Sequence, residues 1–212
     1  MRVLVIEDRD RDAEAAVEIL REAGHEVSFC HEPGAMALDC NGMPDRGGCP
    51  LDHGGIDVAV MGRAPVIATG VDAGHDPSAR EAGVGCAKRH RVPVVITGRP
   101  GAASLPPWAT DIVDVDDPNL VERIDAAAVR GRVPLVDAAE SAARSVLDGA
   151  GRGQEPLVGR VVREDRRLRV IVDVAAELDD RLRETIGVRV AGAVRAIETS
   201  SPSIDVQVLS HP

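Results

Sequence analysis

The first 130 residues alternate between short apolar runs and longer segments whose apolar positions lie three or four residues apart. Continuous apolar runs are typical of strands buried on both faces of a parallel sheet, and the wider spacing is typical of helices. The sequence therefore predicts five strands, at 3–6, 25–29, 56–61, 93–97 and 111–115. It predicts helices between them, at 11–23, 78–90 and 119–129. Strands that alternate with helices form βαβ units, so we expect an α/β fold with a doubly wound, five-stranded parallel sheet.

The last third of the chain has a different pattern. Two runs rich in β-branched residues, 158–162 and 168–174, are separated by a charged turn and predict a hairpin. Apolar positions three or four apart over 178–197 predict an amphipathic helix, and 203–209 alternates as a closing strand. The predicted order is that of a small α+β (ββαβ) module. We expect three parts: a domain over 1–130, a helical linker over 131–155 with its helix at 138–147, and the module over 156–212.

Charge and aromatic content argue against a nucleic-acid partner. The net charge is −10, and residues 152–212 hold ten Arg and ten Asp or Glu, so the acidic excess lies before residue 152. Phe29 and Trp108 are the only Phe, Trp or Tyr residues, which leaves few platforms for stacking on nucleobases. Binding to a phosphate backbone needs a basic surface, and no helix–turn–helix pair is predicted. We therefore expect protein partners and no nucleic acid.

No apolar run reaches the ~20 residues needed to span a bilayer. The opening apolar residues are followed at once by Glu7 and Asp8, which is not the pattern of a signal peptide. We therefore expect a cytoplasmic protein without a membrane span. In that compartment, the four cysteines are more often reduced, metal-bound or redox-active than joined in a disulfide framework.

Four segments of the first domain form a recognisable series: VLVIEDRDRD, DVAVMG, VPVVITG and TDIVDVDDP. Together they resemble the receiver domain of two-component response regulators. The resemblance places the family's acidic metal-binding pair on Glu7 and Asp8, and its hydroxyl switch residue on Thr97. It places the phosphorylated aspartate on Gly62 and the invariant lysine close to Val115. The domain thus resembles a receiver that lacks both its phosphoacceptor and its lysine.

The chemistry of phosphoryl transfer makes these differences decisive. The reaction needs a carboxylate nucleophile, a divalent cation held by further carboxylates, and a cation that balances the transferred charge. Glu7 and Asp8 could hold Mg²⁺, or could be polar residues at the end of a strand. Gly62 cannot be phosphorylated, so we expect a pseudo-receiver that works without phosphorylation. A dinucleotide-binding fold is disfavoured, because acidic residues fill the position of its glycine-rich phosphate loop.

Three cysteines could meet at the amino-terminal edge of the sheet. Cys40 and Cys49 flank a loop rich in Gly and Pro, and Cys86 lies in a helix that descends to the same edge, with His53 or His90 in reach. Three thiolates and one imidazole would complete a tetrahedral zinc site, and three thiolates could also hold an iron–sulfur cluster. A Cys40–Cys49 disulfide and incidental buried thiols are the alternatives.

The segment LRVIVDVAAELDDRLRETIGVRVAGAVRAIETSSPSIDVQVL lies at the centre of the last module. It is similar in pattern to the alkaline-shock protein family, which implies a non-catalytic role in assembly or in the envelope stress response. The residues themselves include no titratable cluster, no cysteine and no phosphate loop. An open sheet edge and a Val-rich surface would suit self-association by strand or face pairing. A small packed domain with a solvated surface is the simpler alternative.

The sequence thus favours a non-enzymatic signalling, regulatory or scaffold protein. A pseudo-receiver would act through protein–protein contacts, with a cysteine metal or thiol site as a further input and the last module for association. The alternative is a redox sensor or enzyme that depends on a metal or an iron–sulfur cluster and is built on Cys40, Cys49 and Cys86. Zinc and an iron–sulfur cluster are the cofactors that these residues suggest.

Overall fold

The computed structural model describes much of the chain. The described residues are 1–7, 11–31, 48–52, 55–63, 82–98, 105–164, 167–199 and 201–211. By its internal contacts the chain divides into two compact units, unit 1 (Met1–Gly131) and unit 2 (Arg132–Pro212). Each unit has its own hydrophobic core and is described by itself.

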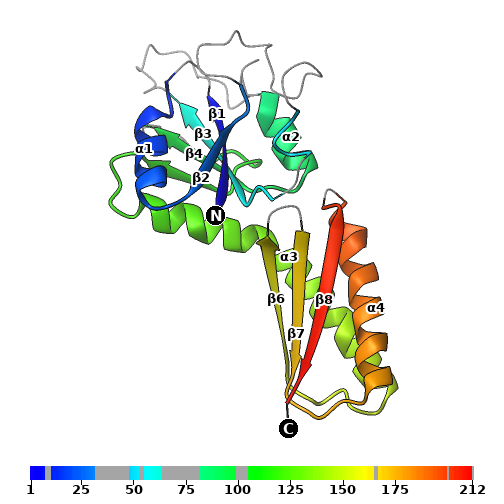
Figure 1. Cartoon of the computed structure of the whole chain (residues 1–212). Helices are drawn as coiled ribbons and strands as arrows, with labels where there is room; N and C mark the ends of the chain where they lie inside the picture. Colours follow the sequence, from blue (N-terminus) through cyan, green and yellow to red (C-terminus); the bar gives the residue numbers. More distant parts are fainter. Residues whose placement is uncertain are drawn as a thin grey trace. The chain divides into compact units, whose positions relative to one another are not determined.

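Unit 1 is built on a sheet of five parallel strands (Figure 1). In chain order the strands are β1 (Arg2–Glu7), β2 (Glu26–Phe29), β3 (Val58–Arg63), β4 (Val94–Gly98) and β5 (Asp111–Asp114). Their order across the sheet is β2-β1-β3-β4-β5, and every neighbouring pair is parallel. The chain therefore runs first to one side of β1 and then to the other, as in doubly wound folds. The predicted α/β fold class is confirmed.

Helices cover both faces of this sheet. Helix α1 (Glu14–Glu22) and the first part of α3 (Leu120–Gly149) pack on one face, and α2 (Gly83–Arg89) packs on the other (Figure 1). Side chains alternate along a strand, so each face receives every second strand residue. The face under α1 and α3 includes Val3, Val58, Val60, Val95 and Val113. The face under α2 includes Leu4, Ile6, Ala59, Met61, Val94 and Ile96. Both sets are buried, which explains the continuous apolar runs of the sequence.

Unit 2 contains a three-stranded sheet in the order β6-β7-β8. Strands β6 (Leu157–Glu164) and β7 (Arg167–Val174) form an antiparallel hairpin. Helix α4 (Asp180–Ile197) then crosses over, and β8 (Ser203–Ser210) returns parallel to β7. The predicted ββαβ order is therefore present.

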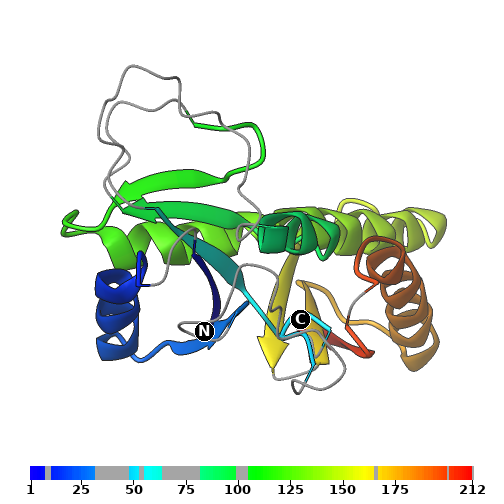
Figure 2. The ribbon, with the colours of Figure 1, turned by 90° about the horizontal axis from the view of Figure 1, so that it is seen from above.

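Helix α3 departs from the sequence-based expectation. The sequence predicts a helix that ends near 129, a second one at 138–147, and a linker role for residues 131–155. The structure has one helix of 30 residues with Pro134 inside it (Figure 1, Figure 2). Proline removes one hydrogen bond from a helix interior, which is why the sequence indicates a break there. The helix continues because its second half is held by packing in unit 2.

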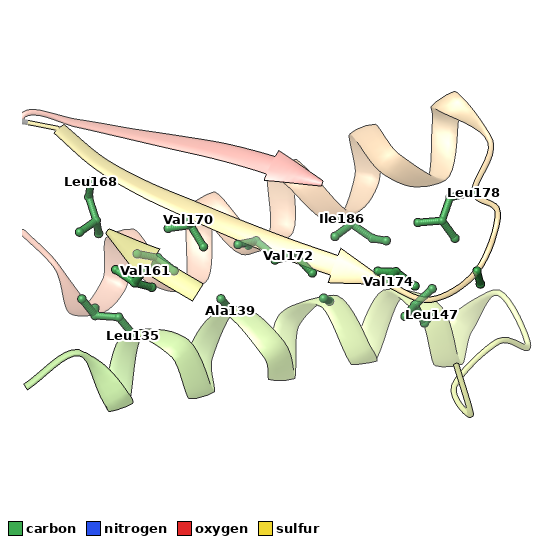
Figure 3. Packing of buried hydrophobic residues seen from close by; sticks show 14 residues of the cluster. Leu135, Ala139, Leu147, Val161, Leu168, Val170, Val172, Val174, Leu178 and Ile186 are labelled. Carbon is green, nitrogen blue, oxygen red and sulfur yellow. The ribbon is translucent and has the colours of Figure 1, made fainter. Parts of the chain in front are cut away.

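The core of unit 2 lies between the sheet and two helices (Figure 3). Alternate residues of β7 have no exposed surface, and they face apolar side chains of α3 and α4. The β7 residues are Leu168, Val170, Val172 and Val174. The α3 residues are Leu135, Ala139, Ala143 and Leu147, one from each turn, and those of α4 include Ile186, Val190 and Val194. The second half of α3 is thus part of unit 2, although the sequence favours a linker there.

A buried ion pair closes one end of unit 2. The Arg163 guanidinium, on β6, donates to the Glu198 carboxylate at 2.6 Å, and the two side chains are 9% and 3% exposed. Glu198 also accepts a hydrogen bond from the backbone N–H of Ser201 at 3.1 Å. The pair joins the hairpin to the connection between α4 and β8. Removal of one partner from such a pair leaves an uncompensated buried charge, which is costly.

Among the helices that the structure describes, none is both long enough and apolar enough to cross a membrane.

The division of the chain predicts which fragment folds alone. We expect residues 132–212 to unfold cooperatively on heating, and residues 156–212 to show no cooperative transition, because the shorter fragment lacks the α3 side of the core. Circular dichroism of the two purified fragments checks this. Within the longer fragment, Leu147→Ala should cost about 2–5 kcal/mol of unfolding free energy. A folded, cooperative 156–212 fragment would show that α3 is dispensable.

Candidate functional site

Three residues lie side by side at the carboxyl-terminal edge of the parallel sheet. Glu7 of β1 is in register with Gly62 of β3, and Gly62 is in register with Thr97 of β4. All three continue the set of strand positions that face α1, because each lies two residues beyond a valine of that face. In doubly wound sheets this edge is where ligands bind. These three residues, called the edge row below, are positions to which the receiver resemblance assigns its site.

Glu7 holds the start of helix α1. Its side chain is buried, with 8% of the residue exposed, and Oε1 accepts a hydrogen bond from the backbone N–H of Ala13 at 3.1 Å. Ala13 immediately precedes α1 and has no side chain that could cap the helix. A carboxylate beside unpaired N–H groups at a helix start is favourable. Glu7 thus does a structural task in the described part of the chain.

Gly62 leaves no space for a side chain. A Cβ atom built on Gly62 would lie 2.6 Å from Cβ of Ala13, 2.8 Å from its Cα and 2.8 Å from its N atom. Real Cβ atoms essentially never approach other heavy atoms this closely, and two of these three atoms belong to the backbone. Ala13 is 1% exposed, so it cannot move outward without uncovering the core. The position at which the receiver resemblance expects a phosphoacceptor is therefore occupied by Ala13, the residue that precedes α1.

Thr97 is buried beside this contact. It is 1% exposed, and among the described residues no hydrogen-bond partner is found for Oγ1. At the position where the resemblance expects a lysine, the backbone N–H of Val115 donates to the carbonyl of Gly98 at 2.9 Å. Asp8, the second member of the predicted acidic pair, lies outside the described residues.

Two cations of α3, Arg123 and Arg130, contact Asp111 of β5, and Arg130 does so at 3.5 Å. Arg123 of α3 donates to the Asp111 carboxylate at 2.5 Å, which is the main reason why the pKa of Arg123 is raised. The same guanidinium lies 3.3 Å from the Asp117 carboxylate. The backbone N–H of Asn119 donates to Asp117 at 2.8 Å and, together with Arg123, holds the pKa of Asp117 below its usual range. Arg123 is thus engaged by two carboxylates, one of which it shares with Arg130, and does not take the place of the lysine that the receiver resemblance expects.

The residues of the predicted cysteine site are only partly described. Cys40 and His53 lie outside the described residues, whereas Cys49 and Cys86 both pack against the core on the α2 side of the sheet. Nε2 of His90 lies 3.6 Å from Oδ1 of Asp52, which connects the end of α2 to the turn that follows Cys49. This contact brings two short segments together, 49–52 and 86–90.

Each of these segments carries two potential ligands. The backbone N–H of Asp52 donates to the carbonyl of Cys49 at 3.0 Å, and that of His90 donates to the carbonyl of Cys86 at 3.0 Å. Cys86 and His90 are four residues apart in sequence, which is close to one helical turn. A guanidinium N–H of Arg89 donates to Sγ of Cys86 at 3.1 Å. In the part of the chain that is described, no three His, Cys, Asp or Glu residues converge on one metal position.

Cys30 lies elsewhere. Its Sγ is 2.6 Å from the position that a Cβ of Gly83 would take, which places it at the start of α2, while His90 follows the end of α2. No disulfide joins any two of the three described cysteines, Cys30, Cys49 and Cys86. The Cys40–Cys49 disulfide that the sequence allows involves a residue outside the described set.

Comparisons with known proteins add no function. No protein-family model matches the chain, and no curated protein matches it. One similar solved structure is a yeast Spc42 trimeric coiled coil (amino acids 181–211) in a fusion, at 18% identity over 72% of this chain and 93% of that chain, with a TM-score of 0.42. Another is a variant of Aquifex aeolicus Era bound to GDP and AlF4⁻, at 12% identity over 100% of this chain and 93% of that chain, with a TM-score of 0.36. Similarity this low supports no functional argument.

The contact between Gly62 and Ala13 predicts that residue 62 tolerates no side chain. We expect Gly62→Ala and Gly62→Asp to lower the unfolding free energy by about 1–3 kcal/mol through overpacking, measured by urea denaturation. Gly85→Ala is the matched control, because a Cβ there meets nothing within 4 Å, and it should stabilise α2 by about 0.5–1 kcal/mol. Ala13→Gly removes the nearest atom. The double variant with Gly62→Ala should therefore lose less unfolding free energy than the two single variants lose together. Full stability of Gly62→Ala would contradict the close contact.

Proposed function

We propose that the protein is a non-enzymatic regulatory or scaffold protein. Unit 1 acts as a receiver-like domain that binds a protein partner without phosphorylation, and unit 2 serves for association. The observation that carries the proposal is the occupation of the acceptor position by Ala13. A receiver-like domain that carries another residue at the acceptor position could still bind an anion there. A domain in which a neighbouring residue occupies that position has no space for the anion.

The charges around the edge row of Glu7, Gly62 and Thr97 support the same proposal. The Glu7 carboxylate is directed at the start of α1, and Arg123 is engaged by Asp111 and Asp117. A transferred phosphoryl group would bring further negative charge to an edge that already holds the Glu7 carboxylate. Such a group needs a metal ion and a cation to balance it. The domain is therefore expected to present one surface to its partner at all times.

Exposure to small phosphate donors and mimics tests this proposal. We expect acetyl phosphate or beryllofluoride, each with Mg²⁺, to leave the mass of the protein and its amide NMR spectrum unchanged. A receiver with an intact acceptor aspartate, treated in parallel, is the positive control. A stoichiometric phospho-adduct within residues 1–131 would falsify the proposal.

A metal-dependent or thiol-dependent redox sensor is the second candidate. It is favoured by the contact between His90 and Asp52, which brings the segments that carry Cys49 and Cys86 together. Thiolate, imidazole and carboxylate are the ligands that zinc prefers in proteins, and thiolates also hold iron–sulfur clusters. Because no three described ligands converge, such a site would need Cys40 or His53, or a rotation of His90 away from Asp52.

Metal analysis of anaerobically purified protein separates the two candidates. The sensor hypothesis expects about one metal ion or cluster per chain, lost in Cys86→Ser and retained in Cys30→Ser, since Cys30 lies at the other end of α2. An absorption band in the visible range would identify a cluster. Colourless, metal-free protein whose thiols all react freely would rule the sensor out and leave the first proposal standing.

A further inference from the structure

One face of the sheet in unit 2 has no cover within the unit. Both helices pack on the other face, where the β7 residues have no exposed surface. The uncovered face carries the alternate residues of the same strands, including Val158, Val162 and Ile171. Val158 and Val162 are 58% and 37% exposed and belong to the large apolar side chains left exposed in the described chain.

The edges of this sheet offer less opportunity for pairing than its face. Along β6, the backbone N–H of Gly159 donates to Oε1 of Glu140 on α3 at 2.7 Å, so α3 satisfies part of that edge. A Cβ on Gly159 would lie 2.9 Å from Cγ of Glu140, which shows how closely the helix approaches. On the other side of the sheet, α4 contacts β8 from the covered face. A small sheet can associate by strand or by face. The uncovered face offers the larger surface of the two.

The strand register defines a grid of side chains on the open face. Val162, Arg169 and Asp205 form one row across β6, β7 and β8. Arg160, Ile171 and Gln207 form the next row, and Val158, Asp173 and Leu209 the row after it. Ile171 thus lies at the centre, and on β6 two valines flank Arg160. On β7, a basic and an acidic residue lie at opposite sides of Ile171, and β8 adds Asp205, Gln207 and Leu209.

We propose that this face pairs with the same face of a second copy of the chain, about a two-fold axis that crosses the strands at Ile171. The inference rests on the association role proposed for unit 2. A rotation about this axis places the row of Arg169 over the row of Asp173 from the second copy. Two Arg169–Asp173 ion pairs then form, Val162 meets Val158 of the second copy twice, and Ile171 meets its own equivalent. On β8, Asp205 lies over Leu209 of the second copy at the rim of the face, where its carboxylate can stay in water.

Charge selects this axis over the alternative. An axis parallel to the strands would place Arg169 over Arg169 and Asp173 over Asp173 of the second copy, and like charges in direct contact are unfavourable. The crossing axis leaves one like-charge contact, between the two Arg160 side chains. Within the chain, Arg169 lies 4.0 Å from Asp205 and Asp173 lies 3.4 Å from His211, so both charges keep neighbours in the free protein as well.

The size of the face limits the strength of the dimer. Three strands of eight residues cover about 26 by 14 Å, or about 350 Å² on each copy. That area lies below the range of standard interfaces, so the dimer is expected to be weak, with a dissociation constant of roughly 10–500 µM. A weak contact of this kind becomes significant where copies are concentrated or held together by another partner.

Sedimentation velocity of the full chain, at about 5–500 µM under reducing conditions, tests the proposal. We expect a concentration-dependent dimer that Val158→Asp weakens at least about tenfold, because it buries a carboxylate against an apolar partner. Val188→Asp is the matched control, since Val188 on α4 is 66% exposed and lies on the helical side of the unit. It should leave the dimer unchanged. Arg160→Gln removes the like-charge contact and should tighten the dimer.

Charge reversal tests the axis itself. Arg169→Asp and Asp173→Lys should each weaken the dimer, and the double variant should restore it, because the two ion pairs re-form with opposite polarity. Circular dichroism of every variant checks that unit 2 stays folded. A dimer that is lost in Val188→Asp but kept in Val158→Asp would overturn the face and leave the association role intact. A chain that is monomeric at every concentration would overturn both the face and the association role, while the proposal for unit 1 would still stand on the phosphate experiment.

Discussion

Helix α1 can approach the parallel sheet as closely as it does because residue 62 has no side chain. The closeness of Ala13 to Gly62 fixes the first turn of the helix, and the Glu7 carboxylate holds the backbone of that turn from the neighbouring strand. The rest of this face follows from that distance. Ala16 and Leu20 of α1 then fall on the valines of the sheet, and Thr97 is covered completely. A larger residue 62 would lift the whole helix.

This constraint bears on the receiver resemblance, which expects a carboxylate at residue 62. A receiver whose acceptor is replaced by another residue keeps a cavity in which anions and water can still bind. In this chain the space beside Gly62 is occupied by Cβ, Cα and N of Ala13, and the Glu7 carboxylate accepts the backbone N–H of the same residue. The proposed interaction role of unit 1 needs this rigidity, because a surface that never switches must be correct for its partner from the moment it folds.

The sequence predicts the strands well and the helix boundaries less well. Continuous apolar runs such as 3–6 and 93–97 have few other interpretations, and their parallel order follows from the helices between them. The continuity of α3 is harder to predict, because Pro134 indicates a break and the residues that oppose it, such as Ala139 and Ala143, are small and common in any helix. The receiver resemblance directs attention to residue 62 in the sequence. Nothing directs attention to Ala13, since an alanine before a helix carries no signal of a close contact. The partners of Cys49 and Cys86 depend on how distant segments meet, which local pattern does not reveal.

The ion pair between Arg163 and Glu198 has a consequence for the way in which unit 2 forms. Its partners are 35 residues apart, on the hairpin and on the far end of the crossover helix, so they meet only when both are in place. The hairpin of β6 and β7 can form early, because its contacts are local. A contact that closes late adds little to the rate of folding and acts mainly by slowing unfolding. We therefore expect the buried pair to slow the unfolding of unit 2 and to have little effect on the rate at which the unit folds.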